Sequence, residues 1–177
     1  MVRQPSARLS AGRYANQRND LMIRCQPKGI CSWNFFLEGD GHRASLDFNW
    51  LGEQGAIIAD GTPFDVQKHG VFSGQWTLNH AGKQIATAQK STVFTRTFEI
   101  LAPDGTLVLR AESPFGRSFR IERSGEVIAT IAPVHPFTRR ATIATGVPDG
   151  DFTTISFSFW LVVITWRRAA NNSDSGS

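Results

Sequence analysis

Tight-turn pairs recur about every twenty residues along this 177-residue chain, and this spacing constrains the fold more than any other feature. An Asp-Gly pair between alternating apolar segments is a strong β-hairpin signal, because both central residues tolerate positive φ. The pairs are Asp40-Gly41, Asp60-Gly61, Ala81-Gly82, Asp104-Gly105, Ser124-Gly125 and Asp149-Gly150. Other breaks, such as Leu51-Gly52 and Ser113-Pro114, lie near the midpoints between them. The rhythm predicts an antiparallel meander with two strands in each repeat.

Apolar and polar residues alternate within the segments between these breaks. From His42 to Trp50, for example, Ala44, Leu46 and Phe48 fall on one face, which is typical of a half-buried antiparallel strand. Twelve strands are expected, at 20–25, 31–37, 42–50, 55–60, 63–69, 71–80, 83–90, 92–101, 105–111, 116–123, 126–133 and 136–145. A sheet of this size tends to close, and a barrel of twelve strands, with a radius of about 12 Å, needs something to fill it.

The stretch from Phe152 to Trp166 carries no charge and supplies such a filling. Asp151 before it is a suitable N-cap, and Arg167 and Arg168 suit the negative end of a helix dipole. Alternation at 155–159 and the β-branched residues that follow favour a strand by propensity, but the length favours a helix over about 152–168. The side chains expected in the barrel interior are Phe152, Ile155, Phe159, Trp160, Leu161, Val163 and Trp166. The predicted fold class is therefore mainly β, a closed antiparallel β-barrel around a buried C-terminal hydrophobic α-helix.

Length and charge predict one domain at 20–168, a disordered basic tail at 1–19 and a disordered tail at 169–177. The net charge of +4 comes from four arginines in the first nineteen residues, so the expected folded part is neutral. This balance argues against nucleic acid as a partner. The beginning of the chain lacks the apolar core of a secretory signal, which predicts a cytoplasmic location. Cys25 and Cys31 flank a turn, where they either pair across a hairpin or remain separate.

Several segments, in this order, resemble the tubby-like C-terminal superfamily, which includes tubby domains, plant LURP-one-related proteins and phospholipid scramblases. The similar segments are 60–66 (Asp-Gly-Thr-Pro-Phe-Asp-Val), 74–78, 97–100, 119–125 and the apolar run with its two arginines at 159–168. The resemblance covers about residues 20–168, in the style of short bacterial members. It implies a twelve-stranded barrel around a buried helix without established catalytic activity. Tubby domains bind phosphoinositides through basic surface residues. Scramblases are associated with calcium through an acidic segment that Asp149 and Asp151 alone do not reproduce.

The sequence contains no Walker loop, dinucleotide fingerprint, His-Glu-x-x-His or Gly-x-Ser-x-Gly motif, so no catalytic residue, cofactor or metal site is expected. Its four histidines are scattered without ligand spacing. The candidate ligand-binding residues are arginines that alternation places on the same strand face as apolar residues. Arg96 shares a phase with Phe98, Arg117 with Phe115 and Phe119, and Arg139, next to Arg140, with Phe137. These arginines either form a cationic site at one barrel end or reach the rim to structural acid partners.

The leading functional hypothesis is a non-enzymatic binding or scaffolding module at the periphery of a membrane. Its expected partner is an anionic phospholipid headgroup or another protein, and the sequence does not determine its oligomeric state. One alternative is a tail-anchored or scramblase-like membrane protein with 152–166 in the bilayer. Integral insertion is disfavoured because fifteen residues fall short of the about twenty that a bilayer requires. A second alternative is a β-barrel carrier of a small molecule.

Overall fold

A computed structural model describes residues 21–50, 52–70, 74–92, 95–146 and 151–174 of the chain. The expected basic tail at 1–19 and the turn at Asp149-Gly150 lie outside the described residues. Twelve strands precede one helix. They are β1 (Leu21–Pro27), β2 (Phe35–Gly39), β3 (His42–Phe48), β4 (Gly55–Ala59), β5 (Thr62–His69), β6 (Gln75–His80), β7 (Lys83–Lys90), β8 (Thr97–Ala102), β9 (Gly105–Ala111), β10 (Phe119–Arg123), β11 (Glu126–Pro133) and β12 (Ala141–Thr145), followed by α1 (Phe152–Asp174).

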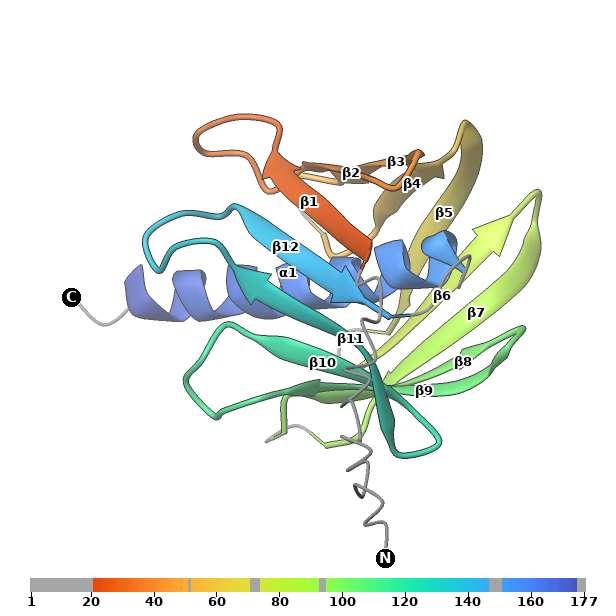
Figure 1. Ribbon diagram of the computed structural model, residues 1–177. Helices are drawn as coiled ribbons and strands as arrows, with labels where there is room; N and C mark the ends of the chain where they lie inside the picture. The colour runs from red at the N-terminus through yellow and green to blue at the C-terminus, as the bar shows by residue number, and fades with distance from the viewer. Residues whose placement is uncertain (1–20, 51, 71–73, 93–94, 147–150, 175–177) are drawn as a thin grey trace, which may run out of the picture.

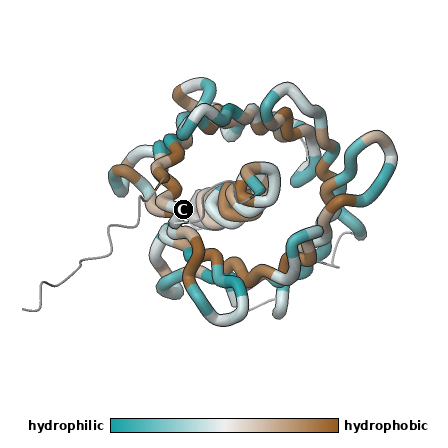
Figure 2. Tube along the Cα trace, turned by 45° about the vertical axis from the view of Figure 1, so that its right-hand side comes forward, coloured by the Kyte–Doolittle hydropathy of each residue, from teal (hydrophilic) through white to brown (hydrophobic). Residues whose placement is uncertain are grey.

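The strands form a closed antiparallel barrel in which each strand pairs with its neighbours in the sequence. β1 closes the ring by pairing with β12, with Ile23 opposite Ile143. Seen along the barrel in Figure 2, the ring of strands encloses the helix. The predicted fold class, a twelve-stranded barrel around a C-terminal hydrophobic helix, is confirmed.

The hairpin turns have the backbone geometry that the sequence predicts. Both central residues have positive φ at Asp40-Gly41, Asp60-Gly61, Ala81-Gly82 and Ser124-Gly125, with values between 48° and 84°. Turns of this kind match the right-handed twist of the flanking strands and fix their register. At Asp104-Gly105 the glycine has φ of 113°. The turn chemistry therefore sets where five of the hairpins reverse.

Helix α1 is buried on every side over its first four turns. All seven side chains expected in the interior are buried, and so are Phe157, Val162 and Ile164 from the other faces. Asp151 caps the helix as predicted, because its Oδ1 accepts the backbone N–H of Thr154 at 3.2 Å. No helix within the described ranges is long and apolar enough to cross a membrane.

The predicted C-terminal boundary of the helix was wrong. The helix continues past Arg168 to Asp174, so residues 169–174 are helical, not part of a disordered tail. Ala169 and Ala170 are strong helix formers, and a helix already fixed by the barrel extends without a new nucleation cost. Only 175–177 of the predicted tail lie outside the described residues.

Five predicted strands begin later than expected. They start at Phe35, Gln75, Thr97, Phe119 and Ala141, although starts at 31, 71, 92, 116 and 136 were predicted. The chain before each of these strands, where described, forms a loop beyond the barrel wall. Consequently Phe115 and Phe137, which the alternation assigned to the phase of the buried residues, are 98% and 92% exposed.

The two barrel ends differ in their connections. At the tight-turn end the short hairpins lie around the beginning of α1. At the opposite end, here called the long-loop end, the strands are joined around the end of α1 by loops whose described residues are 28–34, 49–50, 52–54, 70, 74, 91–92, 95–96, 112–118 and 134–140. Figure 1 shows the β1–β2 and β11–β12 loops reaching toward the C-terminal end of the helix.

Cys25 and Cys31 do not pair. Cys25 lies on the inner face of β1 and is buried, which raises the pKa of its thiol well above the usual value. Cys31 is exposed in the 28–34 loop. The hairpin register places Leu37, not Cys31, opposite Cys25.

Candidate anion-binding site at the long-loop end

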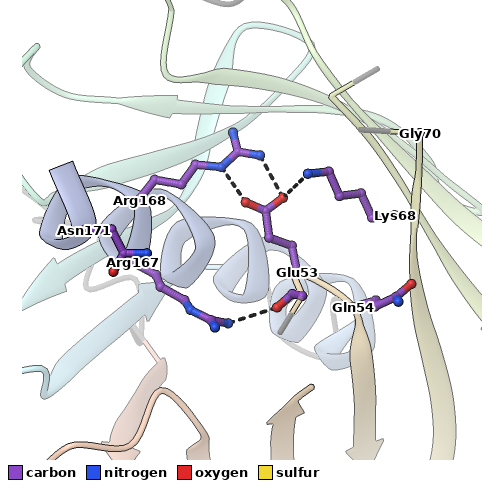
Figure 3. Close-up of a pocket in the computed structure, with 8 residues that line it drawn as sticks. Glu53, Gln54, Lys68, Gly70, Arg167, Arg168 and Asn171 are labelled. Atoms are coloured by element: carbon purple, nitrogen blue, oxygen red, sulfur yellow. Dashed lines mark hydrogen bonds and ion pairs between the residues drawn. The ribbon is translucent and has the colours of Figure 1, made fainter. Parts of the chain in front are cut away.

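One side of the long-loop end holds an ionic network centred on the carboxylate of Glu53. Arg168 donates from Nε and Nη2 to the two carboxylate oxygens of Glu53, at 2.5 Å and 2.7 Å, and Lys68 Nζ lies 2.9 Å from Oε2. Figure 3 shows Arg168 and Lys68 approaching the carboxylate from two directions. Arg167 donates to the backbone carbonyls of Trp50 and Gly52. These contacts fasten the end of α1 to the β3–β4 loop and to β5.

This network keeps the carboxylate of Glu53 negatively charged. Burial alone raises the pKa of Glu53, but hydrogen bonds and positive charge from Arg168 and Lys68 outweigh it, so the pKa is lower than usual. With its carboxylate engaged by two cations, this side of the barrel end has a structural role. Among the described residues, Arg167 binds only backbone carbonyls and keeps its charge, but Arg168 and Lys68 are already engaged by the carboxylate.

We expect replacement of Glu53 by glutamine to lower the free energy of unfolding by more than about 1.5 kcal/mol at neutral pH. The amide is uncharged and turns one of the two acceptor oxygens into a donor, so Arg168 and Lys68 lose their charged partner. A lowered folded-state pKa stabilises the fold above the unfolded value of about 4.3, and the effect is lost as pH falls through the folded value. The difference between wild type and Glu53→Gln should therefore shrink in acid. Urea denaturation at several pH values tests this, with the exposed Glu112→Gln as the matched control. A difference that does not change with pH would contradict this account.

Three arginines meet on the other side of the long-loop end. Arg96, Arg117 and Arg139 precede β8, β10 and β12, and each guanidinium lies over an aromatic ring. The Cζ atom of Arg96 lies 5.0 Å from the ring centroid of Phe119. Cζ of Arg117 lies 4.5 Å from the ring centroid of Trp166, and Cζ of Arg139 lies 4.1 Å from that of Trp33. Trp166 belongs to α1, and its Nε1 donates to the carbonyl of Arg117 at 3.1 Å. The helix end thus forms part of the floor of this site.

Each of these guanidinium groups also holds a neighbouring loop by its backbone. Arg96 Nη1 donates to the carbonyls of Pro114 and Gly116 at 3.2 Å and 2.5 Å. Arg117 Nη1 donates to Pro136 and Thr138 at 3.0 Å and 2.8 Å, and Arg139 Nη1 to Ser32 at 3.1 Å. Carbonyls accept hydrogen bonds without neutralising the charge. The acid partners that the sequence left open as an alternative are therefore replaced by loop carbonyls.

The three guanidinium groups share one depression and carry uncompensated charge. The depression has a volume of about 540 Å³, and Trp166, Phe115 and Phe137 line it with them. Over the part of the chain that the structure describes, no salt bridge joins these arginines to a carboxylate. Desolvation lowers the pKa of Arg96 and of Arg117, and the charge of Arg139 adds to the effect on Arg117. Arginine remains protonated even when its pKa is lowered in this way, so the depression is a site of positive potential.

The structure brings together three of the four arginines singled out in the sequence. Arg140 does not line the depression that the other three share; it lines an adjoining one, which Arg139 and Phe137 also line. The contributions of Trp33, Trp166 and the Glu53 network were not predicted. A sequence signal for the loops exists, because Pro-Phe-x-Arg recurs at 114–117 and 136–139, one β-hairpin apart.

The described residues contain no group of three or more His, Cys, Asp or Glu side chains that could hold a metal ion. His42 lies at the tight-turn end, where its ring stacks on Phe152 and its Nδ1 is 2.7 Å from Asp60. His135 belongs to the 134–140 loop, where its ring packs against Phe137. Cationic side chains, not metal-ligand residues, dominate the long-loop end.

Comparison with known proteins gives information about the fold only. A similar solved structure is the X-ray structure of a protein from Arabidopsis thaliana, with a TM-score of 0.54 and 11% sequence identity. The match covers 83% of this chain and 91% of that chain. No family model and no curated protein matches the sequence.

Proposed function

We propose that this protein is a non-enzymatic binding module that recognises clustered phosphate groups through Arg96, Arg117 and Arg139. The observation that carries the proposal is the charge of three partly buried guanidinium groups in one depression without a carboxylate partner. Guanidinium is the side chain best suited to phosphate, because its planar donors bind oxygen atoms in pairs. The phosphate source is an anionic phospholipid headgroup or a soluble phosphate.

Pre-organisation supports the same function. Each arginine is fixed by its ring stacking and by its loop carbonyl before any ligand arrives. Binding then loses less side-chain entropy than it would with mobile surface lysines. An arriving anion also relieves the repulsion between Arg117 and Arg139. The closed barrel thus serves as a rigid support for a charged binding surface.

We further propose that the chain is a distant relative of the tubby-like superfamily and acts at the cytoplasmic face of a membrane. The order of the similar segments and the barrel around a C-terminal helix support this relationship. Lipid recognition at a loop-covered barrel end would be consistent with it.

The test is isothermal titration of the full chain with inorganic pyrophosphate, using two neighbouring arginines as a matched pair. Arg139→Gln should weaken binding by about tenfold or more, the effect of losing one charged hydrogen-bonding group. Arg140→Gln removes the same charge one residue away, outside the depression, and should change affinity by less than about threefold. Equal losses in both variants would show diffuse charge attraction, and an absence of pyrophosphate binding would refute the proposal. Urea denaturation of both variants verifies that the fold is retained.

A further inference from the structure

Four large apolar side chains project from the long-loop end, one from each of four loops. Ile30, Trp50, Phe115 and Phe137 are 99%, 85%, 98% and 92% exposed. Exposed apolar residues on the barrel wall, such as Phe36 at 55% and Leu101 at 54%, are about half covered. These four residues, called the loop tips below, are thus displayed far more fully than any single apolar residue on the wall.

Each loop tip belongs to a loop that an arginine holds by its backbone. The carbonyls bound by Arg96 flank Phe115, and those bound by Arg117 flank Phe137. Arg139 binds the carbonyl of Ser32, two residues after Ile30, and Arg167 binds the carbonyl of Trp50 itself. The same device therefore occurs four times. A cation at the barrel rim fixes the loop backbone while the apolar side chain stands outward.

Charge is distributed unequally along the barrel axis. The tight turns between strands contain Asp40, Asp60 and Asp104 and no lysine or arginine. The long-loop connections and the helix end contain three acidic residues, Glu53, Glu112 and Asp174. Their basic residues are Lys28, Arg96, Arg117, Arg139, Arg140, Arg167 and Arg168. An anionic surface would attract the long-loop end and repel the other, which orients the barrel before contact.

We infer that the loop tips insert into the interface of an anionic lipid bilayer, with the barrel axis directed toward the membrane. This inference rests on the proposed phosphate-binding function and adds an apolar anchor to it. A bilayer provides an apolar layer beneath a layer of phosphates, which matches loop tips standing beyond a level of arginines. Tryptophan is also enriched at this interface.

The test measures cosedimentation of the full chain with phosphatidylcholine vesicles with and without phosphatidylserine. We expect binding that requires phosphatidylserine. The double variant Ile30→Ser, Trp50→Ser should lower the partition coefficient by about a hundredfold, about tenfold for each buried side chain. A wall variant, Phe36→Ser, Leu101→Ser, is the matched control and should bind as wild type. Bromine-labelled lipids should quench wild-type tryptophan fluorescence more strongly than that of Trp50→Phe.

Titration with pyrophosphate separates failure of this inference from failure of the proposed function. Ile30 and Trp50 do not line the arginine depression, so the loop-tip double variant should bind pyrophosphate as wild type does. Vesicle binding that is equal in the loop-tip and wall variants would overturn insertion. So would pyrophosphate binding without vesicle binding, which would leave a soluble phosphate or a phosphorylated partner as the ligand. If wild type itself does not bind pyrophosphate, the proposed phosphate-binding function is refuted as well.

Discussion

Replacing Trp160 with alanine is expected to lower the free energy of unfolding by about 3 to 5 kcal/mol, the range for removing a large buried aromatic side chain. Trp160 is completely buried at the centre of the barrel. Its ring stacks on Phe48 with centroids 3.6 Å apart, and its Nε1 donates to the carbonyl of Glu53 at 3.1 Å. The variant would lose this packing and leave the carbonyl of Glu53 without that donor. Urea denaturation monitored by circular dichroism measures the change.

Trp50→Ala provides the matched control. Trp50 lies in the same β3–β4 loop as Glu53, but its side chain is 85% exposed. Its removal should change the free energy of unfolding by less than about 0.5 kcal/mol. If the two tryptophan variants were equally stable, α1 would not be the core of the barrel.

The second large effect is expected at Gly55, where the barrel wall approaches the helix most closely. A Cβ atom at this position would clash with the carbonyl oxygen of Asp47 and lie 2.9 Å from Cη2 of Trp160. The backbone φ of 157° also disfavours a side chain. Gly55→Ala should therefore destabilise the protein by at least about 2 kcal/mol, as overpacking of a rigid core does.

Gly52→Ala in the preceding loop is the control for Gly55→Ala. A Cβ there meets first the Cγ of Gln54 at 3.4 Å, a flexible side chain that can move. Thermal unfolding of the two alanine variants should differ by several degrees in Tm. Equal midpoints would mean that Trp160 yields to the added methyl group and that the helix is loosely packed.

Most of the fold could be predicted because its determinants are local. Asp-Gly pairs fix where hairpins reverse, and alternation indicates the inner face of each strand. The helix required a different inference, since 155–159 alternates like a strand and Val162 to Ile164 favour β structure by propensity. Burial in the barrel overrides that propensity, because an isolated segment with unpaired backbone groups could not occupy the interior. The number of strands, and not the segment itself, indicated the helix.

The strand boundaries at the long-loop end were predicted less accurately than the hairpin turns. Alternation continues in sequence past the barrel rim, so Phe115 and Phe137 were placed on the same phase as Phe119 and Ile143. Nothing in the pattern marks the point where the wall ends and solvent begins. Once the chain forms a loop, those phenylalanines are free to point outward, and their exposure creates the loop tips.

The candidate site was predicted in its residues but not in its chemistry. Arg96, Arg117 and Arg139 were noted because a cation within an apolar phase requires an explanation. Their partners are backbone carbonyls, 20 and 21 residues away for Arg96 and Arg117 and 107 residues away for Arg139. Every residue has such a carbonyl, so no side-chain pattern can indicate these partners. Similarly, Glu53 gives no sign in the sequence that it neutralises Arg168 across the barrel end.

The most direct test of the account is to observe the arginine side chains themselves while an anion is added. The Nε–Hε NMR signals of arginine can be followed in the full chain during titration with pyrophosphate, with assignment by single Arg→Lys variants. The account predicts that the signals of Arg96, Arg117 and Arg139 shift together. Arg43, which pairs with Glu38 at the tight-turn end, should not change. Equal shifts of all arginine signals, or shifts confined to Arg167 and Arg168, would contradict a phosphate site formed by Arg96, Arg117 and Arg139.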